Sequence, residues 1–168
     1  DTLVVDKTGT LTVGKPSVSR VIAAEGFDDD DVLVAAASVN QSSEHPLARA
    51  VTVAAEAGGL ALVEPVDFTA HPGYGVSAAV ADRSVIVGNL DLMTDNGVTV
   101  DDDLRAAAPA GQTAIHVAID GREAGVVLLV DEVKDSTPAA VADLHADALT
   151  IVMATGDAEG PAREVAGA

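Results

Sequence analysis

Residues 6–12, with the sequence DKTGTLT, combine one acid, one base and several small residues directly behind the apolar run of residues 3–5. The apolar run predicts a short buried strand, so that Asp6 lies at its carboxyl end, where open α/β sheets place their chemistry. A carboxylate there, followed by a turn that contains Gly9, is suited to attack a phosphoryl group whose oxygens are received by backbone N–H groups of the turn. An isolated carboxylate of this kind is as often a turn cap, but the complete pattern favours a nucleophile. We therefore predict that Asp6 is nucleophilic.

The elements that would position this motif follow from hydrophobic periodicity and from turn and cap residues. Strands are predicted over residues 3–5, 18–22, 60–68, 75–80, 84–88, 113–119, 123–130 and 149–154. Helices are predicted over residues 28–39, 46–57, a short stretch after Asn89, 101–108 and 137–148. The dipeptide Asp120-Gly121 and the tripeptide of residues 81–83 are typical of hairpin connections.

The order of these elements predicts two kinds of fold. Residues 1–16 and 131–168 form two parts of one α/β domain, whose parallel sheet contains the segments LVV and TIVMA as neighbouring strands. Residues 17–130 form an inserted α+β domain, an antiparallel sheet flanked by helices. The expected organisation is therefore one domain interrupted by another.

Composition excludes several classes of protein. The chain has 168 residues, 48% of them apolar, which is enough for a globular core. Nine basic against 27 acidic residues give a formal net charge of -18, which argues against nucleic acid or an anionic membrane surface as partner. There is no cysteine, and no apolar run approaches the roughly 20 residues of a membrane span. We therefore expect a soluble chain, and we expect it to be a monomer. Because the sequence opens inside a strand and without Met, we also expect it to be a piece of a longer polypeptide.

The DKTGTLT segment resembles the phosphorylation signature of the P-type ATPases, ion pumps whose aspartate is phosphorylated by ATP. The resemblance implies a haloacid-dehalogenase-like fold for the α/β domain, with Asp6 as the phosphorylated residue and Lys7 and Thr8 beside it in the catalytic site. It also implies ATP and Mg²⁺ as cofactors, with Asp6 and Thr8 among the magnesium ligands. The alternative is a haloacid-dehalogenase-type phosphatase or phosphotransferase not coupled to transport. Such enzymes carry a second Asp two residues after the nucleophile, where this chain has Thr8.

Three further segments resemble the nucleotide pocket of the heavy-metal-transporting P-type ATPases: SEHPLA at residues 43–48, GYGV at residues 73–76 and VGN at residues 87–89. A histidine at a helix start can contact or stack on a nucleotide, glycines let backbone approach a ring or phosphates, and an asparagine offers a donor and an acceptor. Each segment alone is a weak signal, but their order is specific. The resemblance implies nucleotide contacts from Glu44, His45, Pro46, Gly73, Gly75, Val76, Gly88 and Asn89.

The chain departs from this branch at several positions. Asn40 stands where many members have a Glu that contacts adenine, and its carbonyl oxygen can still accept from an amino group. Asp131 and Lys134 resemble the ends of a DxxK hinge, which implies that both side chains approach the nucleotide or its phosphates; a solvated domain junction is an equal alternative. The later lysine and the GDGxND magnesium motif are missing, so we expect incomplete turnover. A TGDN-like catalytic segment, in which Ala158 replaces the Asn, contains Thr155, Gly156 and Asp157.

The resemblance implies the cytosolic ATP-binding and phosphorylation portion of a metal-exporting pump. Copper is the expected ion, because residues 1–6 and 87–93 are similar to the copper-exporting branch. The expected partners are ATP or ADP and the membrane and actuator domains of the same pump, at the cytoplasmic face of the cell membrane. A nucleotide-binding regulatory module is a third alternative. The acidic runs of residues 28–31 and 101–103 are interpreted as helix starts, and the remaining histidines as ordinary structural residues.

Overall fold

The computed structural model describes residues 2–109 and 111–154. The catalytic candidates outside this description are Thr155, Gly156 and Asp157, together with the side chains of Lys7 and Thr8. The chain divides into two compact units. The first unit consists of Asp1–Pro16, Pro109–Thr113 and Val130–Ala168, and the second unit of Ser17–Ala108 and Ala114–Leu129. The first unit thus includes six residues that the sequence pattern assigns to the inserted block, namely residues 109–113 and Val130.

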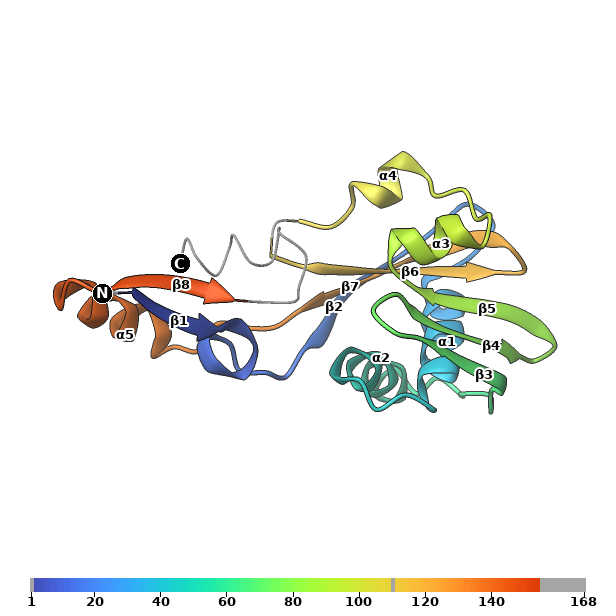
Figure 1. The fold of residues 1–168 in the computed structure, drawn as a ribbon. Coiled ribbons are helices and arrows are strands. Elements are labelled where there is room, and N and C mark those ends of the chain that lie inside the picture. Colours follow the sequence, from blue (N-terminus) through green and yellow to red (C-terminus); the bar gives the residue numbers. More distant parts are fainter. Residues whose placement is uncertain (1, 110, 155–168) are drawn as a thin grey trace. The chain divides into compact units, whose positions relative to one another are not determined.

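The first unit contains a two-stranded parallel sheet. Strand β1 (Thr2–Asp6) pairs in parallel with strand β8 (Thr150–Ala154). A π-helical turn, η1 (Lys7–Leu11), follows β1, and helix α5 (Thr137–Ala146) precedes β8 (Figure 1). The prediction that the two ends of the chain share one parallel sheet is therefore confirmed.

The second unit is built on a six-stranded sheet with the order β2-β7-β6-β5-β4-β3. The pairs β3–β4, β4–β5 and β5–β6 are antiparallel, as predicted for the inserted domain. The two predicted hairpins close through residues with positive φ, Ala81 and Asp82 in one and Asp120 and Gly121 in the other. The strands of this sheet are β2 (Ser17–Ala23), β3 (Val66–His71), β4 (Gly75–Val80), β5 (Arg83–Gly88), β6 (Thr113–Ile119) and β7 (Arg122–Val130).

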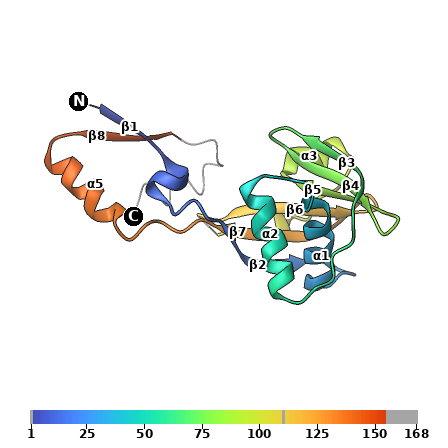
Figure 2. The same ribbon diagram turned by 90° about the horizontal axis from the view of Figure 1, so that it is seen from below.

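Helices cover both faces of this sheet (Figure 2). The alternation along β5 separates the two faces, because Val85 and Val87 belong to the core that includes α1 and α2, whereas Ile86 packs with Met93 of α3. On the second face, Leu104 of α4 packs against strand β7. The prediction of an antiparallel sheet flanked by helices is confirmed. The helices are α1 (Asp29–Asn40), α2 (Pro46–Ala57), α3 (Leu90–Asp95) and α4 (Asp102–Arg105).

Two predicted elements have a boundary that differs from the prediction by three residues or more. The strand predicted over residues 60–68 begins only at Val66, directly after Pro65, which has no N–H to donate to a sheet. The helix predicted over residues 101–108 ends at Arg105, because Leu104 is its one buried residue and packing supports little more than one turn. Among the described residues, no helix is long and apolar enough to cross a membrane.

Candidate functional site

Asp6 is the last residue of β1, and it is exposed. It lies opposite Ala154, the last residue of β8, so the two parallel strands end together at one edge. The chain leaves β1 through the π-helical turn η1, a geometry that is frequent at functional sites. Gly9 within the turn has a φ of 77°, which a residue with a side chain rarely adopts. The structure thus places the predicted nucleophile at an accessible strand end before an unusual turn.

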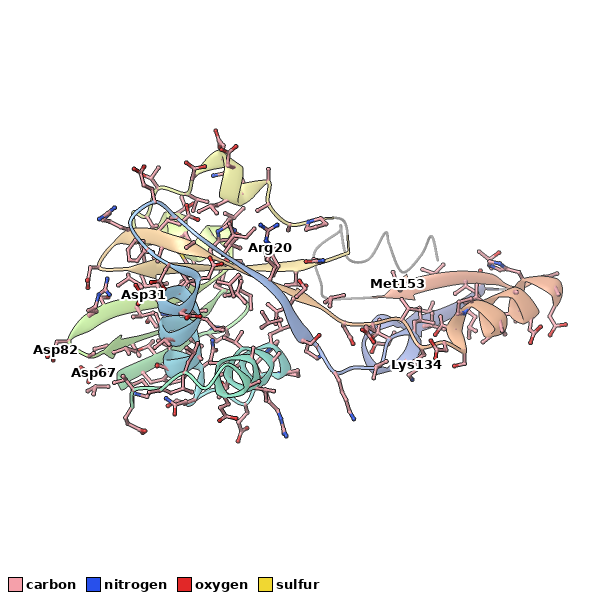
Figure 3. The ribbon with its side chains drawn as sticks, turned by 180° about the vertical axis from the view of Figure 1, so that it is seen from behind. Arg20, Asp31, Asp67, Asp82, Lys134 and Met153 are labelled. Atoms are coloured by element: carbon pink, nitrogen blue, oxygen red, sulfur yellow. The ribbon has the colours of Figure 1, made fainter. Side chains whose placement is uncertain are left out.

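Asp131, which was expected to approach a nucleotide, lies against the turn that follows Asp6. Its Oδ2 accepts a hydrogen bond from the hydroxyl of Thr12 at 2.6 Å. Lys134 lies beside the same turn, and its Nζ donates to the carbonyl oxygen of Gly9 at 2.6 Å (Figure 3). The DxxK segment is therefore joined to the DKTGTLT segment by side-chain hydrogen bonds within the first unit.

His45 is the N-cap of helix α2. Its Nδ1 accepts a hydrogen bond from the backbone N–H of Leu47 at 3.2 Å. Because Nδ1 is the acceptor, a neutral ring carries its proton on Nε2. The neighbours Glu44 and Pro46 are exposed, as is His45 itself. The ring therefore uses one nitrogen to begin the helix and keeps its second nitrogen as a donor toward the surroundings.

Gly75 and Gly88 face each other across the β4–β5 pair. A Cβ on Gly75 would lie 2.1 Å from the carbonyl oxygen of Val87, and a Cβ on Gly88 would lie 2.3 Å from that of Tyr74. Leu92 of α3 fills the space above both glycines, with its Cδ2 2.9 Å and 2.7 Å from the two ideal Cβ positions. The close contacts with the neighbouring strand and with α3 leave no room for a side chain at either position. The sequence pattern did not indicate this packing role.

Asn89 joins the β3–β4 turn to helix α3. Its Oδ1 caps the helix by accepting from the N–H of Leu92 at 3.0 Å, and its Nδ2 donates to the carbonyl oxygen of Gly73 at 3.3 Å. The backbone N–H of Asn89 also donates to the carbonyl oxygen of Tyr74 at 2.9 Å. Val76, which follows the turn, is half-buried and packs against the main core. The GYGV and VGN segments therefore form one connected structure.

Asn40, the last residue of α1, is only 6% exposed. Its Nδ2 donates to the carbonyl oxygen of Ala36 at 2.9 Å within the same helix. One N–H of the Asn40 amide is therefore used within the helix. The role of Oδ1 as an acceptor for a ligand stays a prediction.

The second unit brings several of the candidate segments to one end of its sheet. The β3–β4 turn and the β5–α3 junction meet through the bonds of Asn89, and the N-terminal end of α2 lies at the same end of the sheet (Figures 1 and 2). His45, Gly73, Gly75, Gly88 and Asn89 all belong to these elements. The sequence order of the motifs thus corresponds to a spatial grouping within this unit.

A buried polar pair in the second unit was not recognised from the sequence. His116 Nδ1 lies 3.0 Å from Glu123 Oε1, and the two side chains are only 3% and 5% exposed. The other carboxylate oxygen of Glu123 accepts from the backbone N–H of Asp101, the N-cap of α4, at 2.7 Å. The sequence indicated this pair only through the positions of the histidine and the glutamate, which lie on the two strands of a predicted hairpin.

A magnesium site needs several hard oxygen ligands around one ion. Among residues 2–109 and 111–154, no group of three His, Asp or Glu side chains is arranged to hold a metal ion. Asp6 offers a hard carboxylate oxygen of the kind that Mg²⁺ prefers. The described part of the chain therefore does not complete the predicted magnesium site with its own side chains.

Comparison with known proteins agrees with both units. The model of the haloacid dehalogenase-like hydrolase family matches residues 1–168. Copper-transporting ATPase 2 of Rhizobium meliloti (strain 1021) is 40% identical over 169 residues, which cover 99% of this chain and 20% of that protein. The chain thus spans about a fifth of the length of this relative.

Two solved structures show where the fold recurs. The catalytic domain of the CPx-ATPase CopB-B superposes with a TM-score of 0.73 at 28% identity, covering 99% of this chain and 57% of that one. The N-domain of HMA6, a copper-transporting P-type ATPase, superposes with a TM-score of 0.61 at 30% identity, covering 68% of this chain and 98% of that one. The chain therefore belongs to the haloacid dehalogenase-like hydrolases, and its homologues at about 40% identity are copper- and heavy-metal-transporting P-type ATPases.

Proposed function

We propose that the chain is the cytosolic ATP-binding and phosphorylation portion of a heavy-metal-exporting P-type ATPase, with Cu(I) as the transported ion. The observation that carries the proposal is Asp6, an exposed carboxylate at the carboxyl end of a parallel strand. The choice of copper is supported by the copper-transporting relative. In the complete pump, this portion works at the cytoplasmic face of the membrane with the membrane and actuator domains.

The reaction follows from the position of Asp6. One carboxylate oxygen forms a bond to the γ-phosphorus of ATP while the bond from that phosphorus to the β–γ bridging oxygen breaks, and ADP leaves. Lys7, Thr8, Thr155, Gly156 and Asp157 surround the transferred group in this proposal. Water then hydrolyses the acyl phosphate. Because Thr8 offers no carboxylate to activate that water, the intermediate lives long enough for the pump to change conformation.

The second unit is the nucleotide-binding domain in this proposal, and the first unit is part of the phosphorylation domain. His45 presents its Nε2 and its exposed ring to the nucleotide, while Nδ1 holds the helix. Asn40 contributes Oδ1. The backbone around Gly73 and Asn89 forms the opposite side of the site. The remaining contacts come from Glu44, Pro46, Gly75, Val76 and Gly88.

Magnesium is part of the proposal through Asp6 and Thr8. A carboxylate and a hydroxyl are hard oxygen ligands, and Mg²⁺ usually combines one or two carboxylates with substrate phosphates and water. When bound, the ion offsets negative charge on the phosphates. The described residues do not complete such a site by themselves. The further ligands would come from the nucleotide and from the GDGxND motif that the resemblance implies for the complete pump.

The phosphorylation proposal is tested on the full-length protein with ATP labelled in the γ-phosphoryl group. We expect acid-stable label on the wild type, and a loss of about 100-fold or more for Asp6→Asn, since the amide is a poor nucleophile. The matched control is Asp143→Asn, an exposed acid on α5, which should label normally. Label that persists on Asp6→Asn would refute the nucleophile. Stimulation of turnover by Zn(II) but not by Cu(I) would refute the choice of metal.

Nucleotide binding is tested on the chain itself by titrating ADP into the ¹⁵N-labelled protein. We expect chemical-shift changes at His45 and Leu47, at Gly73 and Gly75, and at Asn89. These amides belong to the elements that meet at one end of the sheet. Shift changes confined to the β4–β5 and β6–β7 turns would place the nucleotide elsewhere. A phosphatase without transport is distinguished by rapid release of inorganic phosphate with no accumulated phosphoenzyme.

A further inference from the structure

A set of hydrogen bonds holds the turn after Asp6 in place. Residues 131–137 lie against residues 9–15 within the first unit, and the two segments are more than a hundred residues apart in sequence. Their backbones form a short antiparallel bridge between Thr12 and Val133. The N–H of Val13 donates to Glu132 O at 2.8 Å, and the N–H of Lys134 donates to the carbonyl oxygen of residue 11 at 3.0 Å. The turn is therefore fixed by tertiary contacts.

The carboxylate of Asp131 is the centre of this set. Its Oδ2 accepts from the hydroxyl of Thr12 at 2.6 Å. Its Oδ1 accepts from the backbone N–H groups of Gly14 and Lys15 at 3.0 Å and 3.2 Å. Hydrogen bonds to an ionised carboxylate are about twice as strong as those between neutral groups. Three of the about four acceptor sites of this carboxylate are therefore occupied by hydrogen bonds within the first unit.

Thr12 connects Asp131 to the turn through two hydrogen bonds of its hydroxyl group. Its side chain is completely buried, and its Oγ1 both donates to Asp131 and accepts from the N–H of Gly9 at 3.2 Å. Gly9 is three residues after Asp6, and its carbonyl oxygen accepts from Lys134 Nζ at 2.6 Å. Both backbone polar groups of Gly9 are thus held by side chains.

A steric contact closes the same turn. Gly14 has a φ of 73°, and a Cβ added to it would lie 2.9 Å from the Cα of Gly9. The two ends of the turn therefore pack directly on each other, and Asp131 binds the N–H of Gly14 at that place. Hydrogen bonds to Thr12 and Lys134 and the contact with Gly14 together hold Gly9 in place after β1.

From this geometry we infer that Asp131, Thr12 and Lys134 are positioning residues that fix the turn beside Asp6, and that Asp131 does not act as a nucleotide ligand. The inference rests on the proposed phosphorylation of Asp6. Phosphoryl transfer depends on alignment of the attacking oxygen with the leaving group, and a displacement of about 1 Å can cost about 100-fold in rate. Loosening the turn therefore affects transfer, whereas removing a nucleotide ligand affects the ATP concentration that the reaction requires.

The test compares variants of the full-length protein by the initial rate of phosphoenzyme formation as a function of ATP concentration. Thr12→Val keeps the shape of the side chain and removes the hydroxyl, and Thr12→Ser restores the hydroxyl. We expect Thr12→Val to lower the maximal rate about tenfold or more, with the half-saturating ATP concentration changed by less than about twofold. Thr12→Ser should recover the rate to within about threefold of wild type. Thr99→Val, at an exposed threonine of the second unit, is the matched control.

Asp131→Asn separates the two roles of the carboxylate. A positioning role predicts a reduced maximal rate at an unchanged half-saturating ATP concentration. An unchanged maximal rate with a clearly raised half-saturating concentration would identify Asp131 as a nucleotide ligand and overturn the inference. A wild-type rate for Thr12→Val would also overturn it.

Two further variants keep the test decisive. If Thr12→Val does not fold, Lys134→Met replaces it, since that side chain is half-buried and makes one hydrogen bond to the turn. A positioning role predicts that Lys134→Met lowers the maximal rate at least about threefold without changing the half-saturating ATP concentration, and an unchanged rate would overturn it. Asp6→Asn separates a failure of the proposed function from a failure of the positioning role. Phosphorylation that survives in Asp6→Asn refutes the proposed function, whereas its loss there with normal rates in the other variants refutes only the positioning role.

Discussion

In the first unit, the turn after Asp6 is held by side chains such as Asp131, which lies 119 residues beyond its partner Thr12. In the second unit, the corresponding motif residues are held by their own neighbours. His45 bonds to the residue two positions ahead, and Asn89 bonds to the residue three positions ahead. The turn of the catalytic motif is thus held by residues from the other side of a long insertion in the sequence. The nucleotide motifs are held mainly by local hydrogen bonds at helix starts.

This difference predicts how well each unit tolerates substitution of its motif residues. A helix cap is a local structure, and replacing it costs typically about 1 kcal/mol. A buried threonine shared by a distant carboxylate and a turn leaves several polar groups without partners when it is lost, which costs more. We therefore expect the second unit to tolerate changes at its motif side chains better than the first unit does. The glycine pair and the buried His116–Glu123 pair are the exceptions within the second unit.

The largest effect on stability is expected at Gly75 and Gly88, whose contacts join two strands of the second unit and are not local in sequence. Gly88→Ala would place a Cβ 2.3 Å from a backbone carbonyl oxygen, so strands β4 and β5 would have to separate. We expect the free energy of unfolding of the second unit to fall by about 3 kcal/mol or more. Urea denaturation followed by circular dichroism measures this. Gly58→Ala is the matched control, because its Cβ would meet its nearest atom at an ordinary 3.4 Å. Similar losses for both variants would contradict the steric explanation.

The next effect concerns the buried pair. Glu123→Ala would leave the buried His116 ring and the N–H of Asp101 without their acceptors. We expect a loss of about 2 to 3 kcal/mol in the free energy of unfolding, because unsatisfied buried polar groups are costly. Glu123→Gln retains one acceptor oxygen and should lose about half as much. Equal losses in the two variants would mean that packing, and not hydrogen bonding, explains the role of Glu123.

A smaller effect separates the two uses of His45. His45→Ala removes both the helix cap and the ring, and should cost about 1 kcal/mol of stability as well as nucleotide affinity. His45→Asn keeps a good capping side chain and should retain stability while still losing affinity. Denaturation and ADP titration on the same samples measure both quantities. If His45→Asn binds ADP as well as wild type, the ring has only a structural role, and the capping geometry is its full explanation.

The smallest effect concerns charge. The second unit has 17 acidic and 5 basic residues, and all of the acids except Glu123 are exposed. This net negative field repels a nucleotide at low ionic strength, where the screening length is about 30 Å at 0.01 M salt and about 8 Å at 0.15 M. We therefore expect ADP to bind a few-fold more tightly at the higher salt concentration. Isothermal titration calorimetry at a series of KCl concentrations measures this dependence.

A control for the charge prediction removes acids that lie away from the motif segments. Asp31, Asp67 and Asp82 come from three separate elements of the second unit (Figure 3). Changing all three to Asn should make the salt dependence shallower without altering affinity at high salt. Affinity that falls as salt rises would show that local positive charge outweighs the net field.

Much of the fold could be predicted from the sequence because its signals are local. Pro46 and Gly58 bound helix α2 as expected, and the acids at residues 28–31 supply the cap and first turn of α1. The Asp120-Gly121 turn fixes the β6–β7 hairpin through two positive φ angles. The strand predicted over residues 60–68 was too long, because apolar residues also pack against a core from irregular segments, as Leu60 and Leu62 do.

For the candidate site, the sequence by itself determined that Asp6 lies at the end of a strand before a turn, since both are properties of consecutive residues. It also determined that the motifs at His45 and Asn89 begin helices. Only the tertiary structure decided that Asp131 binds Thr12 and the turn, that Gly75 and Gly88 face each other beneath Leu92, and that Glu123 joins His116 to α4. The physical reason is distance along the chain. Hydrogen bonds and close contacts between segments far apart in sequence leave no periodic pattern, so they are fixed only when the whole domain closes.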